Sequence, residues 1–285
     1  MGRIRNSWNL VKQSFAILRS DTVLMLYPVL SAIACVLATA FVVAGGGIVA
    51  FPAIRAATQA NVHWQPTPLF SVVGVFVFYL VNYFVMVFFN TALVGAATIR
   101  LQGGTPTLRD GLALAWERKG IILQWAVLAA TVGTVLKMIE QRAQLIGRLV
   151  AKIVGLAWTL ASFFVVPILA FEKLGPVDAL KRSAEIFRKT WGEEVAGGLS
   201  LGLIFFLLTL PGFLLLAAGA VLGHLPGFLI ALALMILYFV FLAVASSAVH
   251  GIFVAALYRY ATTGEVAEGF QAENFSGIWQ AKKNR

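Results

Sequence analysis

Six long apolar stretches, separated by polar segments, dominate the pattern of residues along the chain. Each is long enough and poor enough in charge to cross a bilayer as an α-helix, which takes about 18 or more apolar residues. They cover residues 22–53, 69–99, 120–139, 149–171, 195–222 and 227–258. The pattern therefore predicts an all-α integral membrane protein, a helical bundle with six transmembrane helices.

Three shorter segments carry apolar residues at helical spacing among charged ones. They are residues 4–18, 107–118 and 177–191, and each directly precedes a pair of the apolar stretches. A helix with such a pattern lies in the membrane interface, its aromatic face toward lipid and its charged face toward water. The aromatic residues predicted to contact lipid in this way are Trp8, Phe15, Trp116, Phe187 and Trp191.

The order of these segments predicts three units, each an interfacial helix followed by a transmembrane hairpin, within a single membrane domain of residues 1–285. A true internal repeat and three independent juxtamembrane helices both fit, because Ser7, Gly111 and Ser183, which hold similar places, are unevenly spaced. The chain after the last span, 259–285, is predicted to be a cytoplasmic tail. There we expect a turn at Gly264 and then a short helix carrying Phe275, Ile278 and Trp279, with a disordered tail as the alternative.

Small residues and prolines within the spans predict where helices pack closely or bend. Gly198 with Gly202, and Gly219 with Gly223, form G-x-x-x-G patterns in the fifth span. Small residues let membrane helices approach closely, so we expect contact between the fifth and sixth spans, with a subunit interface as the alternative. The residues that could break or kink a span are Gly45, Gly46, Gly47, Pro167 and Pro211.

The amino-acid composition is typical of a membrane protein and differs from that of a soluble domain. The chain is 60% hydrophobic and 12% charged, with a mean hydropathy of +0.88, whereas soluble domains are about 25% charged. Because the spans take up most of the 285 residues, no separate soluble domain is expected. The single cysteine, Cys35, lies in the first span and cannot form a disulfide framework.

The distribution of basic residues predicts the orientation. Seventeen of the 22 Lys and Arg residues fall on the side of the two termini. Since Lys and Arg accumulate on the cytoplasmic side of membrane proteins, we expect both termini in the cytoplasm and the protein in the cytoplasmic (inner) membrane. The net charge of +10 implies no nucleic-acid partner, because anionic head groups of the inner leaflet are sufficient partners for it.

Three sequence motifs carry a resemblance to known proteins. They are "FFNTALVGAATIRLQGGTPTLRDGLALAWERK" (88–119), "VVPILAFEKLGPVDALKRSAEIFRKTWGE" (165–193) and "ALYRYATTGEVAEGF" (256–270). Together they resemble an uncharacterised family of prokaryotic multi-span membrane proteins, which implies a helical integral membrane protein without an established activity. The Leu-Lys-Arg-Ser…Lys-Thr-Trp-Gly element of 180–192 is also similar to membrane domains found beside glycerophosphodiester phosphodiesterases, which implies lipid-related work.

No motif in the chain predicts catalysis. All 12 carboxylates lie outside the predicted spans, although intramembrane Asp and Glu are the usual elements of proton relays. His63, His224 and His250 fall in three separate regions, so no metal site can be built from them. We therefore expect a protein that is not an enzyme, with no catalytic residue, cofactor or metal.

A few polar side chains within the spans are the candidate functional residues. They are Asn82, Asn90, Ser246, Ser247 and His250. They could line a path for a solute or ion or bind a polar head group. Alternatively, they form interhelical hydrogen bonds, each contributing about 0.6 kcal/mol.

These observations predict a membrane protein that passes or binds a small solute, ion or lipid without catalysis, as a homo-oligomer. The alternative is a scaffold or lipid-organising protein that acts through its interfacial helices. In both cases the expected partners are membrane lipids and anionic inner-leaflet head groups.

Overall fold

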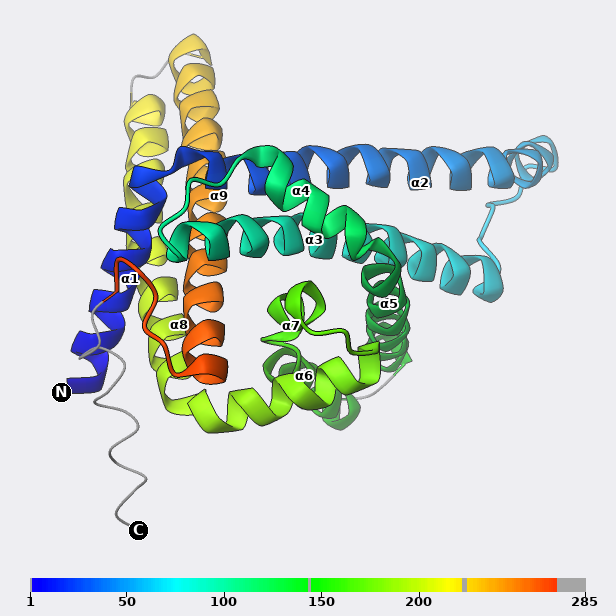
Figure 1. Cartoon of the computed structure of the whole chain (residues 1–285). Helices are drawn as coiled ribbons and strands as arrows, with labels where there is room; N and C mark the ends of the chain where they lie inside the picture. Colours follow the sequence, from blue (N-terminus) through cyan, green and yellow to red (C-terminus); the bar gives the residue numbers. More distant parts are fainter. Residues whose placement is uncertain (1, 143–144, 222–224, 271–285) are drawn as a thin grey trace. The chain divides into compact units, whose positions relative to one another are not determined.

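Helices account for all regular structure in the part of the chain that the structure describes. The computed structural model describes residues 2–142, 145–221 and 225–270, where it contains no strand (Figure 1). Its elements are α1 (Gly2–Ser20), the short 3-10 helix η1 (Thr22–Met25), α2 (Leu26–Gln59), α3 (Pro68–Leu101), α4 (Leu108–Glu117), α5 (Lys119–Arg142), α6 (Leu145–Ala161), α7 (Val165–Phe171), α8 (Pro176–Val221) and α9 (Leu225–Thr263). The predicted all-α class is confirmed for these residues.

Six segments of these helices are long and apolar enough to cross a membrane, as predicted. They are Thr22–Gln59, Pro68–Leu101, Lys119–Gln141, Gly147–Phe171, Leu201–Val221 and Leu225–Thr263. The chain is therefore a multi-pass membrane protein. The helices α1 and α4 match the amphipathic segments expected at 4–18 and 107–118, while their position in the membrane interface stays a prediction.

The chain forms two compact units. The first unit contains residues 1–29, 93–111 and 185–285, and the second contains 30–92 and 112–184. Four helices, α2, α3, α4 and α8, contribute residues to both units. That residues 1–285 act as one membrane domain stays a prediction.

The third amphipathic segment is helical but is not a separate element. Residues 177–191 and the fifth span form one continuous helix, α8, of 46 residues. At 1.5 Å per residue this helix is about 69 Å long, more than twice the roughly 30 Å of a bilayer core. A large part of α8 must therefore lie outside the hydrocarbon, as expected for its charged beginning.

The fourth span is broken within the second unit. Helix α6 ends at Ala161 and α7 begins at Val165, so Pro167 occupies the first turn of α7, where its missing N–H costs nothing. The break frees the amide of Phe164, which donates to the Ser183 hydroxyl of α8 over 2.9 Å. Both residues are fully buried. Of the predicted breaking positions, only Pro167 lies beside a break, because α2 and α8 remain helical through Gly45–Gly47 and Pro211.

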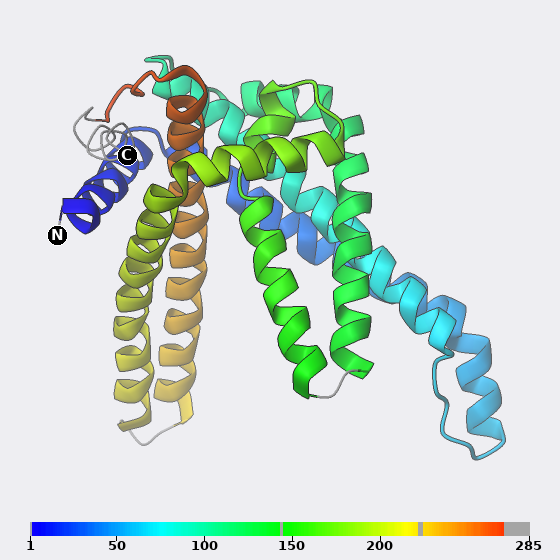
Figure 2. The same cartoon turned by 90° about the horizontal axis from the view of Figure 1, so that it is seen from below.

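Within the first unit, α8 and α9 form an antiparallel hairpin (Figures 1 and 2). They approach closely at Gly219, where a Cβ atom would collide with Ala231 of α9. The predicted contact between the fifth and sixth spans is thereby confirmed. Gly202 instead faces open space, so it plays no part in that contact.

A strap of residues 264–270 follows α9 and packs within the first unit. Gly264 adopts a left-handed conformation, with φ +73°, and its N–H bonds to the carbonyl of Tyr260, so the predicted turn is confirmed. The amide of Glu268 donates to the carbonyl of Leu101 over 3.0 Å, and Phe270 is buried. The helix predicted around Phe275 lies outside the described residues.

Candidate functional site

Asn82 of α3, one of the predicted polar residues, makes hydrogen bonds at both ends of its side chain. Its carbonyl accepts from the Thr39 hydroxyl of α2 over 3.2 Å, and its NH₂ donates to the Phe78 carbonyl over 2.9 Å. Both partners belong to the second unit. The bond to Thr39 is of the kind that the interhelical alternative requires, whereas the bond to Phe78 lies within α3.

The other predicted polar residues are spread over both units. Asn90 of α3 is exposed and belongs, like Asn82, to the second unit. Ser246 and Ser247 of α9 are half-buried and His250 is exposed, all three in the first unit. Neither unit by itself contains the whole set, so a common polar lining stays a prediction. Among the residues that the structure describes, no three His, Cys, Asp or Glu side chains are grouped as metal ligands would be.

The aromatic residues predicted to contact lipid occupy different environments. Trp116 of α4 is 63% exposed, and the Lys119 ammonium lies 3.9 Å from the centre of its ring. Phe187 of α8 is buried, which leaves little of its ring for lipid. Phe15 of α1 is half-buried and packs on α8. The side chains of Trp8 and Trp191 lie outside those that the structure describes.

The first unit contains a groove, here called the α1 groove, that no sequence pattern predicted. It has a volume of about 710 Å³ and is bounded by α1, η1, α8 and α9. Its apolar walls are formed mainly by Phe15, Leu18, Phe205, Leu208, Phe241 and Leu242. Two cationic side chains, Lys12 and Arg19 of α1, also line it, and none of the other described side chains that line it is a carboxylate. The arrangement suits an elongated apolar ligand with an anionic end.

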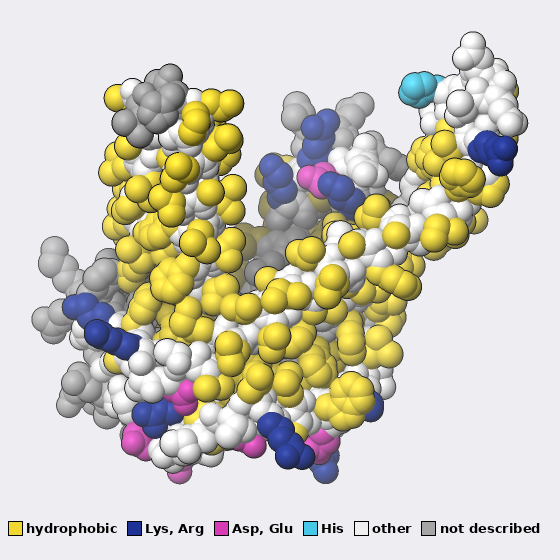
Figure 3. All heavy atoms as spheres, turned by 90° about the horizontal axis from the view of Figure 1, so that it is seen from above, with side chains coloured by type: hydrophobic (Ala, Val, Ile, Leu, Met, Phe, Trp, Pro, Cys, Tyr) yellow, Lys and Arg dark blue, Asp and Glu magenta, His cyan; other side chains and the backbone are white. Residues whose placement is uncertain are grey.

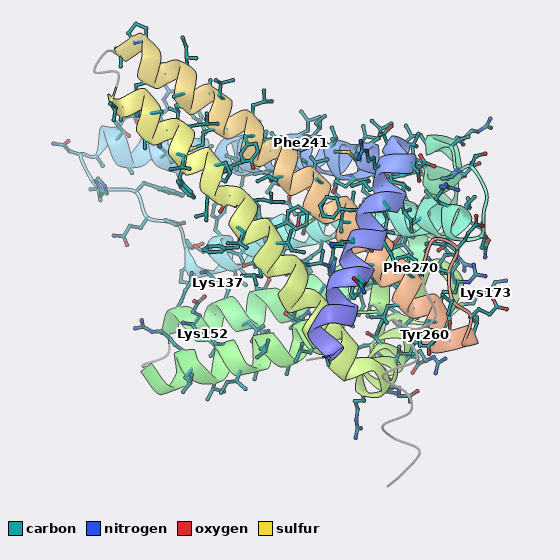
Figure 4. The ribbon with its side chains drawn as sticks, turned by 90° about the vertical axis from the view of Figure 1, so that its left-hand side faces the viewer. Lys137, Lys152, Lys173, Phe241, Tyr260 and Phe270 are labelled. Carbon is teal, nitrogen blue, oxygen red and sulfur yellow. The ribbon has the colours of Figure 1, made fainter. Side chains whose placement is uncertain are left out.

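Aromatic side chains hold the walls of the α1 groove together. Phe15 stacks on Phe205 of α8, with ring centroids 5.6 Å apart. Tyr238 of α9 also lines the groove, and its hydroxyl donates to the Leu208 carbonyl of α8 over 2.6 Å, so this hydroxyl is already used within the protein. Figure 4 shows α1 crossing α9, with Phe241 labelled on α9. The groove is therefore built from three helices that contact one another directly.

The α1 groove lies beside the end of an exposed apolar surface on α9. On α9, large exposed apolar side chains run from Leu225 to Phe241, and none follows before the helix ends at Thr263. These 17 positions span about 25 Å, close to the thickness of a hydrocarbon core. Figure 3 shows hydrophobic side chains covering this hairpin, the projection at the upper left. Phe241, the last of these exposed side chains, also lines the groove.

The two cations of the groove, Lys12 and Arg19, lie on the helix that packs beside this apolar hairpin. Lys12 and Arg19 are both exposed, whereas the hairpin contains no Asp, Glu, Lys or Arg between residues 195 and 258. In the sequence, Lys12 and Arg19 fall outside the apolar stripe of α1 that contains Phe15, so the pattern did not predict that the three residues line one groove. Nor did it predict which helices face them, from residues some 190 to 230 positions away.

A family model matches residues 69–270 and carries the description "Family of unknown function (DUF6159)". The chain belongs to this family. The matched residues include the α8 and α9 walls of the α1 groove, and α1 precedes them. No curated protein and no solved structure matches the chain. The family has no assigned activity, so function has to be argued from the groove.

Proposed function

We propose that this member of the DUF6159 family is a non-catalytic membrane protein that binds a membrane lipid in the α1 groove. The observation that carries the proposal is an aromatic, apolar groove beside the exposed apolar surface of α9, with two cations in its lining. Its volume of about 710 Å³ lies within the range of roughly 300 to 1,000 Å³ that is usual for ligand pockets.

The lining of the groove favours a lipid over the small solute or ion that the sequence also allowed. A polar solute needs several convergent polar groups to replace its hydration shell. The groove offers Lys12, Arg19 and Thr22 on one helix and the turn after it, while α8 and α9 contribute apolar surface. The Tyr238 hydroxyl, which could have served a polar ligand, bonds to the Leu208 carbonyl instead.

The bound lipid belongs, in this proposal, to the leaflet on the side of the termini. The excess of Lys and Arg on that side supports a cytoplasmic orientation in the inner membrane. The similarity of the 180–192 element to membrane domains beside glycerophosphodiester phosphodiesterases is in keeping with a lipid ligand. Assembly into a homo-oligomer stays a prediction and does not affect the groove, which lies within one chain.

Filling the α1 groove tests the proposal. Ala16 is an exposed small residue that lines the groove, so Ala16→Trp places a ring in it without disturbing a buried core. Native mass spectrometry of the purified full chain measures how many lipid molecules remain bound. We expect retained lipid to decrease in Ala16→Trp and to be unchanged in the matched control Ala218→Trp, since Ala218 is exposed on α8 outside the groove.

The same experiment separates this proposal from the scaffold alternative. If the wild-type chain retains no lipid through purification, or if Ala16→Trp retains as much as the wild type, the groove is not a lipid site. The interfacial helices would then become the better candidates for function. Equal thermal unfolding midpoints of the two variants ensure that any difference in retained lipid comes from the groove.

A further inference from the structure

We infer that the second unit binds a water molecule between α3 and α5, held by the hydroxyls of Tyr83 and Thr134. Both residues lie in segments that are long and apolar enough to cross a membrane. Both also belong to the second unit, so this inference goes beyond the proposed function and does not depend on the α1 groove.

The first argument is the buried hydroxyl of Thr134 on α5. Thr134 is only 5% exposed, and its hydroxyl has no hydrogen-bond partner in the part of the chain that the structure describes. Other threonines within the spans donate instead to the carbonyl four residues earlier in their own helix. They are Thr91, Thr98, Thr131 and Thr159. Because lipid chains offer no hydrogen-bonding group, the partner of the Thr134 hydroxyl has to come from the protein or from an ordered water molecule.

The second argument is the space beside Gly133, the residue before Thr134. A Cβ atom added to Gly133 would lie 3.6 Å from each of its nearest neighbours, Cδ2 of Tyr79 and Cε2 and Oη of Tyr83. This is an ordinary van der Waals distance, so the space between α5 and the two rings has room for a methyl group. A water molecule is about as large as a methyl group, and the Tyr83 hydroxyl would be one of its neighbours.

The third argument is the number of hydrogen bonds that this place offers. A buried water molecule typically makes about three hydrogen bonds. The hydroxyls of Tyr83 and Thr134 can each donate one and accept others, and a backbone carbonyl of the same turn of α5 retains a second lone pair beside its helical bond. An apolar group would fill the space but leave the Thr134 hydroxyl unpaired. Water is therefore the occupant that uses both the space and the hydroxyls.

The water molecule would extend a polar layer that already joins two helices of the second unit. Asn82 precedes Tyr83 on α3, and its carbonyl accepts from the Thr39 hydroxyl of α2 over 3.2 Å. Consecutive residues of a helix differ by only about 1.5 Å in height, so Asn82 and Tyr83 lie at nearly the same level. The layer would thus connect α2, α3 and α5 through Thr39, Asn82, Tyr83 and Thr134.

Solid-state NMR of the full chain in lipid bilayers tests the inference directly, with water itself as the probe. Magnetisation transfer from water to the amides of residues 133 and 134 reports a water molecule held beside them. We expect this transfer in the wild type and its loss in Gly133→Ala, whose methyl group takes up the space. The matched control is Gly155→Ala on α6, where an added Cβ meets only Leu136 Cδ1 at 3.8 Å and the transfer should persist.

Thermal unfolding provides a second and independent measurement. Thr134→Val keeps the shape of the side chain and removes its hydroxyl, and Tyr83→Phe removes the other hydroxyl. We expect each variant to unfold about 2–4 °C below the wild type, the shift that the loss of one buried hydrogen bond produces in a protein of this size. The double variant should unfold hardly lower than either single variant, because one water molecule joins the two hydroxyls. Thr131→Val, which removes an exposed hydroxyl bonded within α5, should leave the midpoint unchanged.

Three results would overturn the inference. One is a wild type without transfer from water to residues 133 and 134, or a transfer that persists in Gly133→Ala. Another is a Thr134→Val variant as stable as the wild type or more stable, since its hydroxyl would then hold nothing. The third is an additive loss of stability in the double variant, which would show that the two hydroxyls share no water molecule. If Gly133→Ala does not fold, the transfer is measured in Thr134→Val and Tyr83→Phe, where it should decrease.

Discussion

Phe15 of α1 and Phe205 of α8 stack with their ring centroids 5.6 Å apart and their planes inclined by 23°. This contact joins an amphipathic helix at the beginning of the chain to the apolar hairpin near its end. Both rings line the α1 groove, so the stack also determines how far α1 stands from α8. The contact is thus part of the groove wall as well as of the packing.

Removing this stack should loosen α1. Phe15→Ala loses the aromatic pair, worth about 0.5–1.5 kcal/mol beyond the buried area, and widens the α1 groove. We expect faster amide hydrogen exchange over residues 12–20 and less retained lipid. Trp116→Ala removes a ring that is 63% exposed on α4 and serves as the control. Unchanged exchange of α1 in Phe15→Ala would mean that other contacts hold this helix.

The hydroxyl of Ser183 should be important for the stability of the second unit. It accepts the amide of Phe164 at the break between α6 and α7, and both residues are fully buried. Ser183→Ala leaves that amide without a partner, which costs about 1–3 kcal/mol. We expect a lower unfolding temperature in a detergent-solubilised sample. The control is Ser71→Ala, which removes a hydroxyl from an exposed position on α3 and should hardly change the unfolding temperature. Equal unfolding temperatures for the two variants would contradict a stabilising role of the Ser183 hydroxyl.

The stability of the first turn of α4 should depend on pH. The hydroxyl and the amide of Thr107 both donate to the Asp110 carboxylate, over 2.7 and 2.8 Å, and hold the pKa of Asp110 below its ordinary value. A carboxyl whose pKa is lowered by folding stabilises the fold above its unfolded pKa of about 3.9. That stabilisation is lost as the pH falls through the lower, folded pKa.

Amide exchange corrected for its intrinsic pH dependence is the measurement for this prediction. We expect protection at residues 108–112 to decrease as the pH is lowered from 5 toward 3, where ~3.9 is the ordinary carboxyl value. The control is Asp110→Asn, which cannot ionise and should show weaker protection with no such pH dependence. A wild type with constant protection across this range would show that the pair with Thr107 is not coupled to helix α4.

The packing of the strap after α9 should depend on the glycine at position 269. Gly269 has φ +87°, a conformation that costs a non-glycine residue about 1–2 kcal/mol. Gly269→Ala should therefore weaken the strap and speed exchange of the Glu268 amide, which donates to the carbonyl of Leu101. Gly120→Ala is the matched control, because an added Cβ there meets open space in a helix. Equal exchange of Glu268 in both variants would exclude a structural role for the Gly269 conformation.

Asn82 and Pro167 show where sequence patterns stopped being informative. From the sequence, Asn82 could either line a path through the membrane or form an interhelical hydrogen bond. A break in a span was equally compatible with Gly45–Gly47, Pro167 and Pro211. Asn82 has its bond to Thr39 because α2 lies beside α3 at that point. The helix of the fourth span is interrupted near Pro167, whereas α8 remains helical through Pro211. At the interruption near Pro167, the buried hydroxyl of Ser183 accepts the freed amide of Phe164.

The six apolar spans, the helices α1 and α4 and the turn at Gly264 could all be predicted from the amino-acid sequence. These features depend on residues within a few turns of one another, because hydrophobic length, helical periodicity and glycine conformation are local properties. The α1 groove, in contrast, could not be predicted from the sequence. Its walls come from residues 12–25, 205–208 and 238–245, and their meeting depends on the packing of Phe15 on Phe205 and on the bond between Tyr238 and Leu208. Side chains so far apart in the chain form a site only through the packing of whole helices, which lipid-facing apolar sequence does not specify because lipid and helix surfaces are equally apolar.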